Sequence, residues 1–254
     1  MLIGIGAGVL ILFYIFIVSA NSLAAKMIPL EWEKKIGAIA YENILQNNQK
    51  ITSENVTSAL SKILERIDAH DGSNMKYELA IIDVKQVNAF ALPGGYLIIT
   101  SELLKQAKEA EEVAGVLSHE ITHVLEQHGL KKIIRQAGMG ILIAIILGDA
   151  SIIAQLADLA SNLKILHFDR IQEEKADAGA VKILKQADIS PSHFISFLDI
   201  LKSLEKSNLN DIPELLSTHP MTEKRIERLS KIKEPDNIRS LGINWSSVKS
   251  ILEN

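Results

Sequence analysis

The chain has 254 residues, which is enough for one catalytic domain with a sizeable core and an additional element. Its formal net charge of −4 gives no indication of a nucleic-acid partner. The chain has no cysteine, so disulfide bonds and thiolate metal ligands are excluded, and any metal must be held by histidine and carboxylate side chains.

The amino-terminal segment, residues 1–25, has no charged side chain, and residues 2–18 are almost wholly apolar. This run is close to the about 20 residues that a helix needs to span a bilayer. Val18, Ser19 and Ala20 could form the cleavage site of a signal peptide, but no basic residue precedes the apolar run. We therefore expect a single uncleaved membrane anchor, with a cleaved signal or a buried helix as alternatives. We expect an extracytoplasmic (periplasmic) catalytic domain, although the slight charge bias after the anchor does not fix the side.

Between this segment and the centre of the chain, the sequence predicts two helices and a small sheet. Helical spacing of apolar residues covers 31–46 and 53–69. Three short β-rich segments follow, at 77–84, 89–92 and 96–100. The sequence Pro93-Gly94-Gly95 makes a tight turn between the last two, which indicates a small antiparallel sheet. Because the chain reads as helical from there onward, the predicted class is α+β with helices dominant.

The next helix, predicted over Glu109–His128 with Gly129 as its stop, carries the most informative motif. In this motif His119 and His123 are four residues apart, so they project side by side, about 40° apart around the helix axis, and can bind one metal ion. Glu120 lies roughly 100° further round and can act as a general base beside that ion. The pattern is a metallopeptidase signature, and two solvated histidines on a surface helix are the plain alternative.

A second apolar zone spans residues 138–166. Its first arm, residues 138–147, is too short to span a bilayer. We expect a helical hairpin that folds over the catalytic domain or dips into the membrane surface. This hairpin would lie within a peptidase domain of residues 26–232, and residues 233–254 are predicted to form a C-terminal tail.

A catalytic zinc site needs three protein ligands and one open position, so a third ligand must be found. His128 is nine residues after His119, and nine helical steps would turn it to the opposite side of the helix. We therefore interpret His128 as a hydrogen-bonded core or helix-end histidine.

Glu173 is the better candidate for the third ligand, within a helix predicted over residues 169–186. Asp177 lies one turn further along the same face and could accept a hydrogen bond from the outer nitrogen of a ligand histidine, in a contact that fixes the tautomer. Glu174 would instead face solvent. An ordinary charged helix surface would be the preferred interpretation if the histidine motif were absent.

The chain contains four motifs in a fixed order. They are Asn-Ala-Phe-Ala-Leu-Pro-Gly-Gly at residues 88–95, His119-Glu120-x-x-His123 with His128, Glu173-x-x-Ala176-Asp177, and Thr218-His219-Pro220 with Arg225. This order resembles the HtpX-like peptidase family, gluzincins that also include the CAAX prenyl-protein proteases, over roughly residues 36–229. Because the chain has one plausible membrane span, it looks closest to the single-anchor or periplasmic quality-control branch.

The resemblance implies a zinc-dependent metalloendopeptidase of zincin-like fold, with one zinc ion bound by His119, His123 and Glu173. Glu120 would be the general base for hydrolysis of peptide bonds in unfolded or misfolded proteins, including misassembled membrane and envelope proteins. His219 could act near the open zinc position, by stabilising the oxyanion or by latching the resting site, or could be a helix-entry residue. A catalytically silent, chaperone-like member with a structural metal site is the alternative.

The resemblance also implies that the strand after the Pro-Gly-Gly turn lines the substrate cleft. Its substrate residues would be Gly95, Tyr96, Leu97 and Ile98. An exposed edge strand at residues 96–100 could pair with an extended peptide whatever the sequence of that peptide. Arg225 is expected to be a structural ion-pair partner of a carboxylate near the site.

Overall fold

The computed structural model describes residues 28–137, 168–207, 214–220 and 223–253, together with positions 149, 151–152, 154–155 and 158. The predicted anchor at residues 1–25 lies outside the described residues, and so does most of the predicted hairpin at 138–166. Among the residues that are described, no helix has both the length and the apolar character required to cross a membrane.

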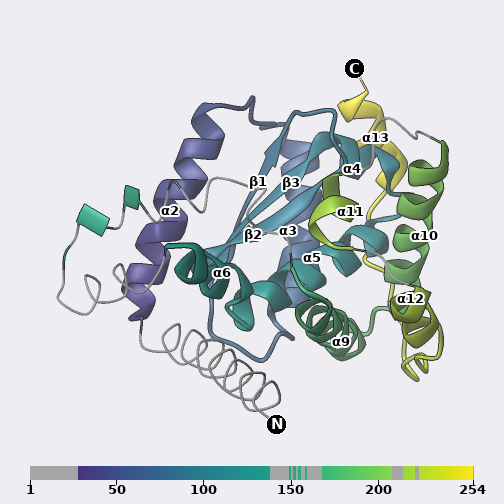
Figure 1. The fold of residues 1–254 in the computed structure, drawn as a ribbon. Helices are drawn as coiled ribbons and strands as arrows, with labels where there is room; N and C mark the ends of the chain where they lie inside the picture. Colours follow the sequence, from purple (N-terminus) through teal and green to yellow (C-terminus); the bar gives the residue numbers. More distant parts are fainter. Residues whose placement is uncertain are drawn as a thin grey trace, which may run out of the picture.

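The described chain folds into helices around a three-stranded sheet (Figure 1). The first elements are α2 (Leu30–Gln46), α3 (Glu54–Asp68), β1 (Glu78–Ile82), β2 (Ala89–Leu92), the 3-10 helix η1 (Pro93–Gly95) and β3 (Tyr96–Thr100). The remaining elements are α4 (Ser101–Gln106), α5 (Ala110–Leu125), α6 (His128–Ala137), α9 (Arg170–Gln186), α10 (Pro191–Ser207), α11 (Glu214–Thr218), α12 (Glu223–Ser230) and α13 (Trp245–Leu252). The predicted mostly helical α+β class is confirmed.

The sheet is mixed, which corrects the predicted antiparallel arrangement. Its strand order is β1-β3-β2. β2 pairs antiparallel with β3, with Leu92 opposite Tyr96, whereas β1 pairs parallel with β3, with Glu78 opposite Tyr96. β3 is therefore the central strand and not the exposed edge strand that was predicted. The reason is that residues 83–88 carry the chain past β3 to its far side, instead of turning back beside β1.

The sheet separates two apolar cores, because alternate residues of a strand point to opposite faces. The larger core lies between one face and a group of helices that includes α3, α5, α9 and α10, and the smaller core lies between the other face and α2 and α6. In Figure 1, α2 lies to the left of the sheet and α10 to the right. The helix α5 is enclosed by this packing, and nearly all of its residues up to Val124 are buried.

The helix α5 ends earlier than predicted. It stops at Leu125, because Gln127 has a left-handed φ of 53° that cannot continue a right-handed helix. A new helix, α6, begins at His128, so Gly129 lies inside α6 and is not a helix stop. The change of direction at Gln127 decides where the side chain of His128 points.

The segment after position 233, predicted as a C-terminal tail, contains the helix α13. This helix packs on α3 and α4. Trp245 and Val248 belong to the larger core, and the indole Nε1 of Trp245 donates a hydrogen bond of 3.0 Å to the carbonyl of Ala107.

Candidate metal centre

The helices α5 and α9 lie so close that no side chain fits between them at one point. A Cβ on Gly179 would lie 2.3 Å from Cγ2 of Thr122. The start of α9 is fixed by Asp169, which forms a complete capping box. Glu173 therefore sits in the first turn of α9, and it is buried.

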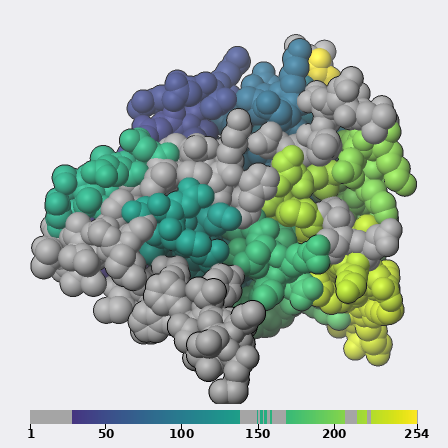
Figure 2. Space-filling model, viewed as in Figure 1, coloured from purple at the N-terminus to yellow at the C-terminus, as the bar shows by residue number. Residues whose placement is uncertain are grey.

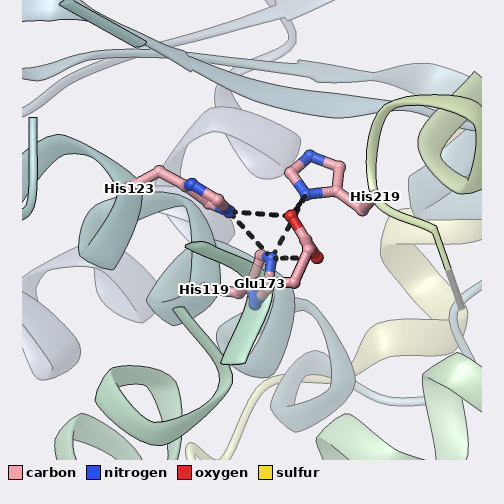
Figure 3. A group of neighbouring side chains, drawn as sticks. All are labelled: His119, His123, Glu173 and His219. Carbon is pink, nitrogen blue, oxygen red and sulfur yellow. Dashed lines mark hydrogen bonds and ion pairs between the residues drawn. The ribbon is translucent and has the colours of Figure 1, made fainter. Parts of the chain in front are cut away.

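Four side chains come together where these helices meet. They are His119 and His123 from α5, Glu173 from α9 and His219 from the segment after α11 (Figure 3). One donor atom of each lies within 4.8 Å of the others, and all four residues are buried. The Nε2 atoms of His119 and His123 are 3.1 Å apart, and the two oxygens of Glu173 each face one of them, with Oε2 3.5 Å from His119 and Oε1 3.5 Å from His123. Imidazole nitrogens and a carboxylate are donor types that bind zinc, so this cluster fits such an ion.

His219 lies inside this cluster. Its Nδ1 is 2.9 Å from Oε1 of Glu173 and 3.3 Å from Nε2 of His119. Its other nitrogen, Nε2, is 3.5 Å from Oε1 of Glu120. His219 therefore contacts two of the three predicted ligands, Glu173 and His119, and also the predicted base, Glu120. It can supply a fourth donor atom.

The helix α11 brings His219 to this position because both of its ends are attached to neighbouring elements. The amide of Leu215 donates to the carbonyl of Val87, just before β2, at 3.2 Å. The carbonyl of Thr218 accepts a hydrogen bond of 3.1 Å from the amide of Phe168, just before α9. Figure 2 shows α11 at the surface next to α9. The segment thus forms an outer wall of the site.

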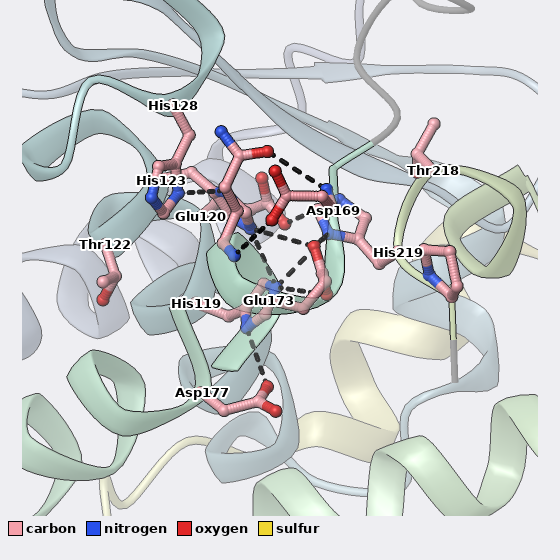
Figure 4. A network of polar contacts seen from close by, with 12 residues as sticks. His119, Glu120, Thr122, His123, His128, Asp169, Glu173, Asp177, Thr218 and His219 are labelled. Carbon is pink, nitrogen blue, oxygen red and sulfur yellow. Dashed lines mark hydrogen bonds and ion pairs between the residues drawn. The ribbon is translucent and has the colours of Figure 1, made fainter. Parts of the chain in front are cut away.

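His119 is held from outside the cluster by Asp177 (Figure 4). The Nδ1 of His119 lies 3.3 Å from Oδ1 of Asp177. The guanidinium of Arg225 donates to both oxygens of Asp177, at 2.8 and 2.7 Å, and lies 2.6 Å from Oε2 of Glu173. The ion-pair role expected for Arg225 is confirmed, and one buried arginine joins two carboxylates of the site.

The pKa values in the cluster follow from burial and from these contacts. Burial would lower the pKa of His119, but Asp177 and Glu173 outweigh it and raise the pKa to about 9. Burial lowers the pKa of His123 well below its ordinary value, against the effect of Glu173. Burial would raise the pKa of Glu173, but His219, His119 and His123 together hold it well below its ordinary value. Glu173 is therefore ionised and His123 neutral, which are the forms that bind a metal.

Glu120 lies beside the cluster and is 1% exposed. Among the described residues, the polar groups nearest its carboxylate are Nε2 of His219, 3.5 Å from Oε1, and the amide of Ala91. Burial raises the pKa of Glu120, although His219 and His119 oppose this. A buried carboxyl group with a raised pKa is suited to accept a proton and to release it again.

Two residues that contact His123 were not identified from the sequence as parts of the site. His128 lies with its Nδ1 2.9 Å from Nδ1 of His123, and the ring of Phe168 stacks on His123 with ring centroids 3.9 Å apart. Burial, with Lys131 and Lys175, lowers the pKa of His128 to about 4, so it is neutral. The predicted hydrogen-bonded core position of His128 is confirmed, but it results from the turn after α5 and not from helical phase.

The predicted substrate residues Gly95, Tyr96, Leu97 and Ile98 do not form the strand edge at the site. Gly95 belongs to η1, and the other three belong to β3, which has a hydrogen-bonded strand on each side. The edge at the site belongs to β2, which contacts α5 and whose Ala91 amide lies near the Glu120 carboxylate. Within the described residues, β2 has no strand partner on its outer side.

Paired histidines on one helix, a carboxylate from a second helix and a glutamate beside them define the class of metal-dependent peptidases. The chain belongs to Peptidase family M48, whose sequence profile matches residues 51–233.

Proteins similar to this chain include two mitochondrial metalloendopeptidases and a bacterial protease. Mitochondrial metalloendopeptidase OMA1 of Schizosaccharomyces pombe is 27% identical over 209 residues, which cover 80% of this chain and 62% of that protein. Beta-barrel assembly-enhancing protease of Yersinia pestis is 26% identical over 215 residues, which cover 80% of this chain and 44% of that protein. Mitochondrial metalloendopeptidase OMA1 of Saccharomyces cerevisiae is 27% identical over 247 residues, which cover 86% of this chain and 71% of that protein. The match thus spans between 44% and 71% of the length of these relatives.

Proposed function

We propose that the chain is a zinc-dependent metalloendopeptidase with one zinc ion per chain. The observation that carries this proposal is the buried four-donor cluster with the buried carboxylate of Glu120 beside it. His119, His123 and Glu173 would hold the ion. A zinc ion bound there would polarise a peptide carbonyl and lower the pKa of an attacking water to about 7.

Glu120 acts as the general base and then as the general acid of the proposed reaction. One of its carboxylate oxygens takes a proton from the attacking water and passes it to the nitrogen of the leaving amine. The raised pKa of Glu120 favours this exchange, because the proton is held between the two steps. The outer edge of β2, beside Ala91, takes the place of the predicted strand as the surface that pairs with an extended substrate.

Replacing the base without changing its shape tests this mechanism. Glu120→Gln should lower kcat on an unfolded protein substrate by about 10²- to 10⁴-fold, because the amide cannot accept the proton. Zinc content, measured by metal analysis of the purified protein, should stay at one ion per chain. Glu126→Gln, at the exposed end of α5, is the matched control and should cleave normally. Undiminished cleavage by Glu120→Gln would refute the mechanism.

His219 is proposed to supply a fourth donor atom in the resting site, which latches that site until substrate displaces the segment after α11. Its 2.9 Å contact with Glu173 supports this interpretation over a distant helix-entry role. His219→Ala should then keep zinc and raise the initial rate of cleavage of a short peptide. A fall in kcat with unchanged KM would instead assign His219 to stabilisation of the oxyanion.

Unfolded or misassembled proteins of a membrane or envelope are the proposed substrates, and the name of one relative, which refers to β-barrel assembly, supports this class. Residues 1–25 are proposed to anchor the chain in a membrane, with the catalytic domain on the extracytoplasmic side. A topology reporter fused after the last residue tests the side, and release of the chain by alkaline carbonate would refute the anchor. A silent, chaperone-like protein would bind zinc and prevent aggregation without any cleavage by the unaltered chain.

A further inference from the structure

The two histidines of the metal motif have different partners on their outer nitrogens. The Nδ1 of His119 faces the carboxylate of Asp177 at 3.3 Å. The Nδ1 of His123 faces Nδ1 of His128 at 2.9 Å, and both of these rings are buried. The second contact is a hydrogen bond between two imidazoles, so exactly one of the two facing nitrogens carries the proton.

The position of the other nitrogen of His123 decides the direction of this hydrogen bond. Nε2 of His123 is the atom that points into the cluster, 3.1 Å from Nε2 of His119 and 3.5 Å from Glu173 (Figure 3). A nitrogen that binds a metal must present its lone pair, so the proton of a neutral ring is on the opposite nitrogen. His123 therefore donates from Nδ1, and His128 accepts at Nδ1.

The local backbone holds His128 in the accepting position. The left-handed conformation of Gln127 separates α5 from α6 and turns the first residue of α6 back toward α5. The side chain of Gln127 is itself fixed by a hydrogen bond of 2.9 Å to the buried carboxylate of Glu33 on α2. Phe168 stacks on the ring of His123, with ring centroids 3.9 Å apart, and so packs this ring in place beside His128.

We propose that His128 is a positioning residue of the metal centre: by accepting the hydrogen bond from His123, it fixes the tautomer and the orientation of this ligand. This inference rests on the proposed zinc site. It gives His128 the role that Asp177 has for His119, with a neutral ring in place of a carboxylate. Loss of such an outer partner costs about 10- to 100-fold in metal affinity.

Three substitutions of His128 distinguish this role from simple filling of the core. His128→Asn places an acceptor, Oδ1, as many bonds from Cβ as Nδ1 is in histidine. His128→Gln extends its amide one bond further, beyond that position, and His128→Leu keeps an apolar side chain without any acceptor. A residue that only fills space should tolerate leucine better than the smaller, polar asparagine. A positioning residue should show the reverse order.

The experiment measures the Kd for Zn²⁺ by competition with a chromophoric chelator, on the purified full chain. We expect a Kd within about threefold of the unaltered protein for His128→Asn, and about 10- to 100-fold higher for His128→Gln and His128→Leu. Urea unfolding of each metal-free variant reports folding separately, and His70→Leu, at the end of α3, is the control at a histidine outside the site. If His128→Leu does not fold, the ratio between the asparagine and glutamine variants carries the same test.

The outcomes separate this inference from the proposed function. If the unaltered chain binds zinc and all three variants bind it equally well, or if leucine binds better than asparagine, the positioning role is wrong while the zinc site stands. If the unaltered chain binds no zinc, the proposed function and this inference both fall.

Discussion

Glu173 and Glu174 are adjacent in the sequence and lie in opposite environments. The side chain of Glu173 is 1% exposed and contacts the two histidines of α5, whereas the side chain of Glu174 is 50% exposed and pairs with Arg228 at 3.0 Å. One helical step of about 100° separates the two, which is enough to move a side chain from the interior to solvent. The chemistry of each carboxylate is therefore set by its phase on α9.

This difference predicts opposite results for the same substitution at neighbouring positions. Glu173→Ala should abolish stoichiometric zinc binding, because it removes the carboxylate proposed as a ligand and leaves Arg225 facing a cavity. Glu174→Ala should bind zinc normally and lose at most about 1 kcal/mol of stability, since its ion pair is exposed. Metal analysis after dialysis and urea unfolding measure the two effects. Normal zinc content in Glu173→Ala would contradict the assigned ligand set.

Helical periodicity was sufficient to predict which residues of α5 and α9 point toward each other. His119, His123 and Glu173 meet because each lies within a regular helix, where angular position follows from sequence spacing. His128 could not be placed in this way, because the left-handed residue before it ends the helix. Phe168 carried no signal either, since it precedes α9 and meets His123 only through the tertiary fold.

At the level of elements, α2 is docked on the Pro-Gly-Gly turn with almost no space between the two backbones. A Cβ on Gly37 would lie 1.8 Å from the carbonyl oxygen of Pro93. The buried carboxylate of Glu33 accepts hydrogen bonds from the amide of Gly94, at 3.3 Å, and from the side chain of Gln127, at 2.9 Å. One side chain of α2 therefore joins the turn that ends β2 to the turn that ends α5.

An exchange of these two side chains should test how α2 supports the site. Gln127→Glu places a second carboxylate against buried Glu33. An unsatisfied buried polar group costs about 1–3 kcal/mol, and we expect this variant to lose more stability than that, because two carboxylates also repel each other. Adding Glu33→Gln again pairs an amide donor with a carboxylate acceptor between positions 33 and 127. The double variant should therefore recover most of the stability that Gln127→Glu loses. Urea unfolding of the single and double variants measures the coupling, and the left-handed backbone at position 127 is the same in both. Independent, additive effects would mean that this contact contributes nothing.

The bounds of the strands could be predicted from the sequence, but the order of the strands in the sheet could not. Local apolar patterns predicted β2 and β3 with the bounds that the structure shows, because the alternation of a strand is visible in its own residues. Pairing between strands depends on residues that are distant in sequence, and a β-rich segment does not state its neighbour. The parallel pairing of β1 with β3, and the edge position of β2 beside the site, therefore had to come from the structure.

For the whole molecule, the C-terminal residues complete the same core that supports α5. Trp245 is 5% exposed, and its hydrogen-bond acceptor, the carbonyl of Ala107, lies just before α5. Glu111, in the first turn of α5, accepts a hydrogen bond of 2.9 Å from the amide of Leu241. These contacts join α13 and the segment before it to the start of the helix that carries the histidine motif. The M48 profile ends at residue 233, whereas the folded unit extends past it.

Trp245 provides a test of whether this unit unfolds as a whole. Trp245→Ala should cost about 3–5 kcal/mol, because it empties a large buried site. Trp245→Phe removes the indole hydrogen bond and should lower the free energy of unfolding by about 0.5–1.5 kcal/mol in addition to the effect of lost packing. The hydrogen-bond part stays this small because Lys249 also donates to the carbonyl of Ala107 and leaves that acceptor satisfied. Ser246→Ala, at the exposed neighbouring position, is the control and should leave stability unchanged.

Urea unfolding of Trp245→Ala, followed by circular dichroism and by zinc release, should give coincident transitions shifted to lower urea. If the zinc-release midpoint stays at its original position while helical signal is lost earlier, α13 is a separate folding unit and does not support the site.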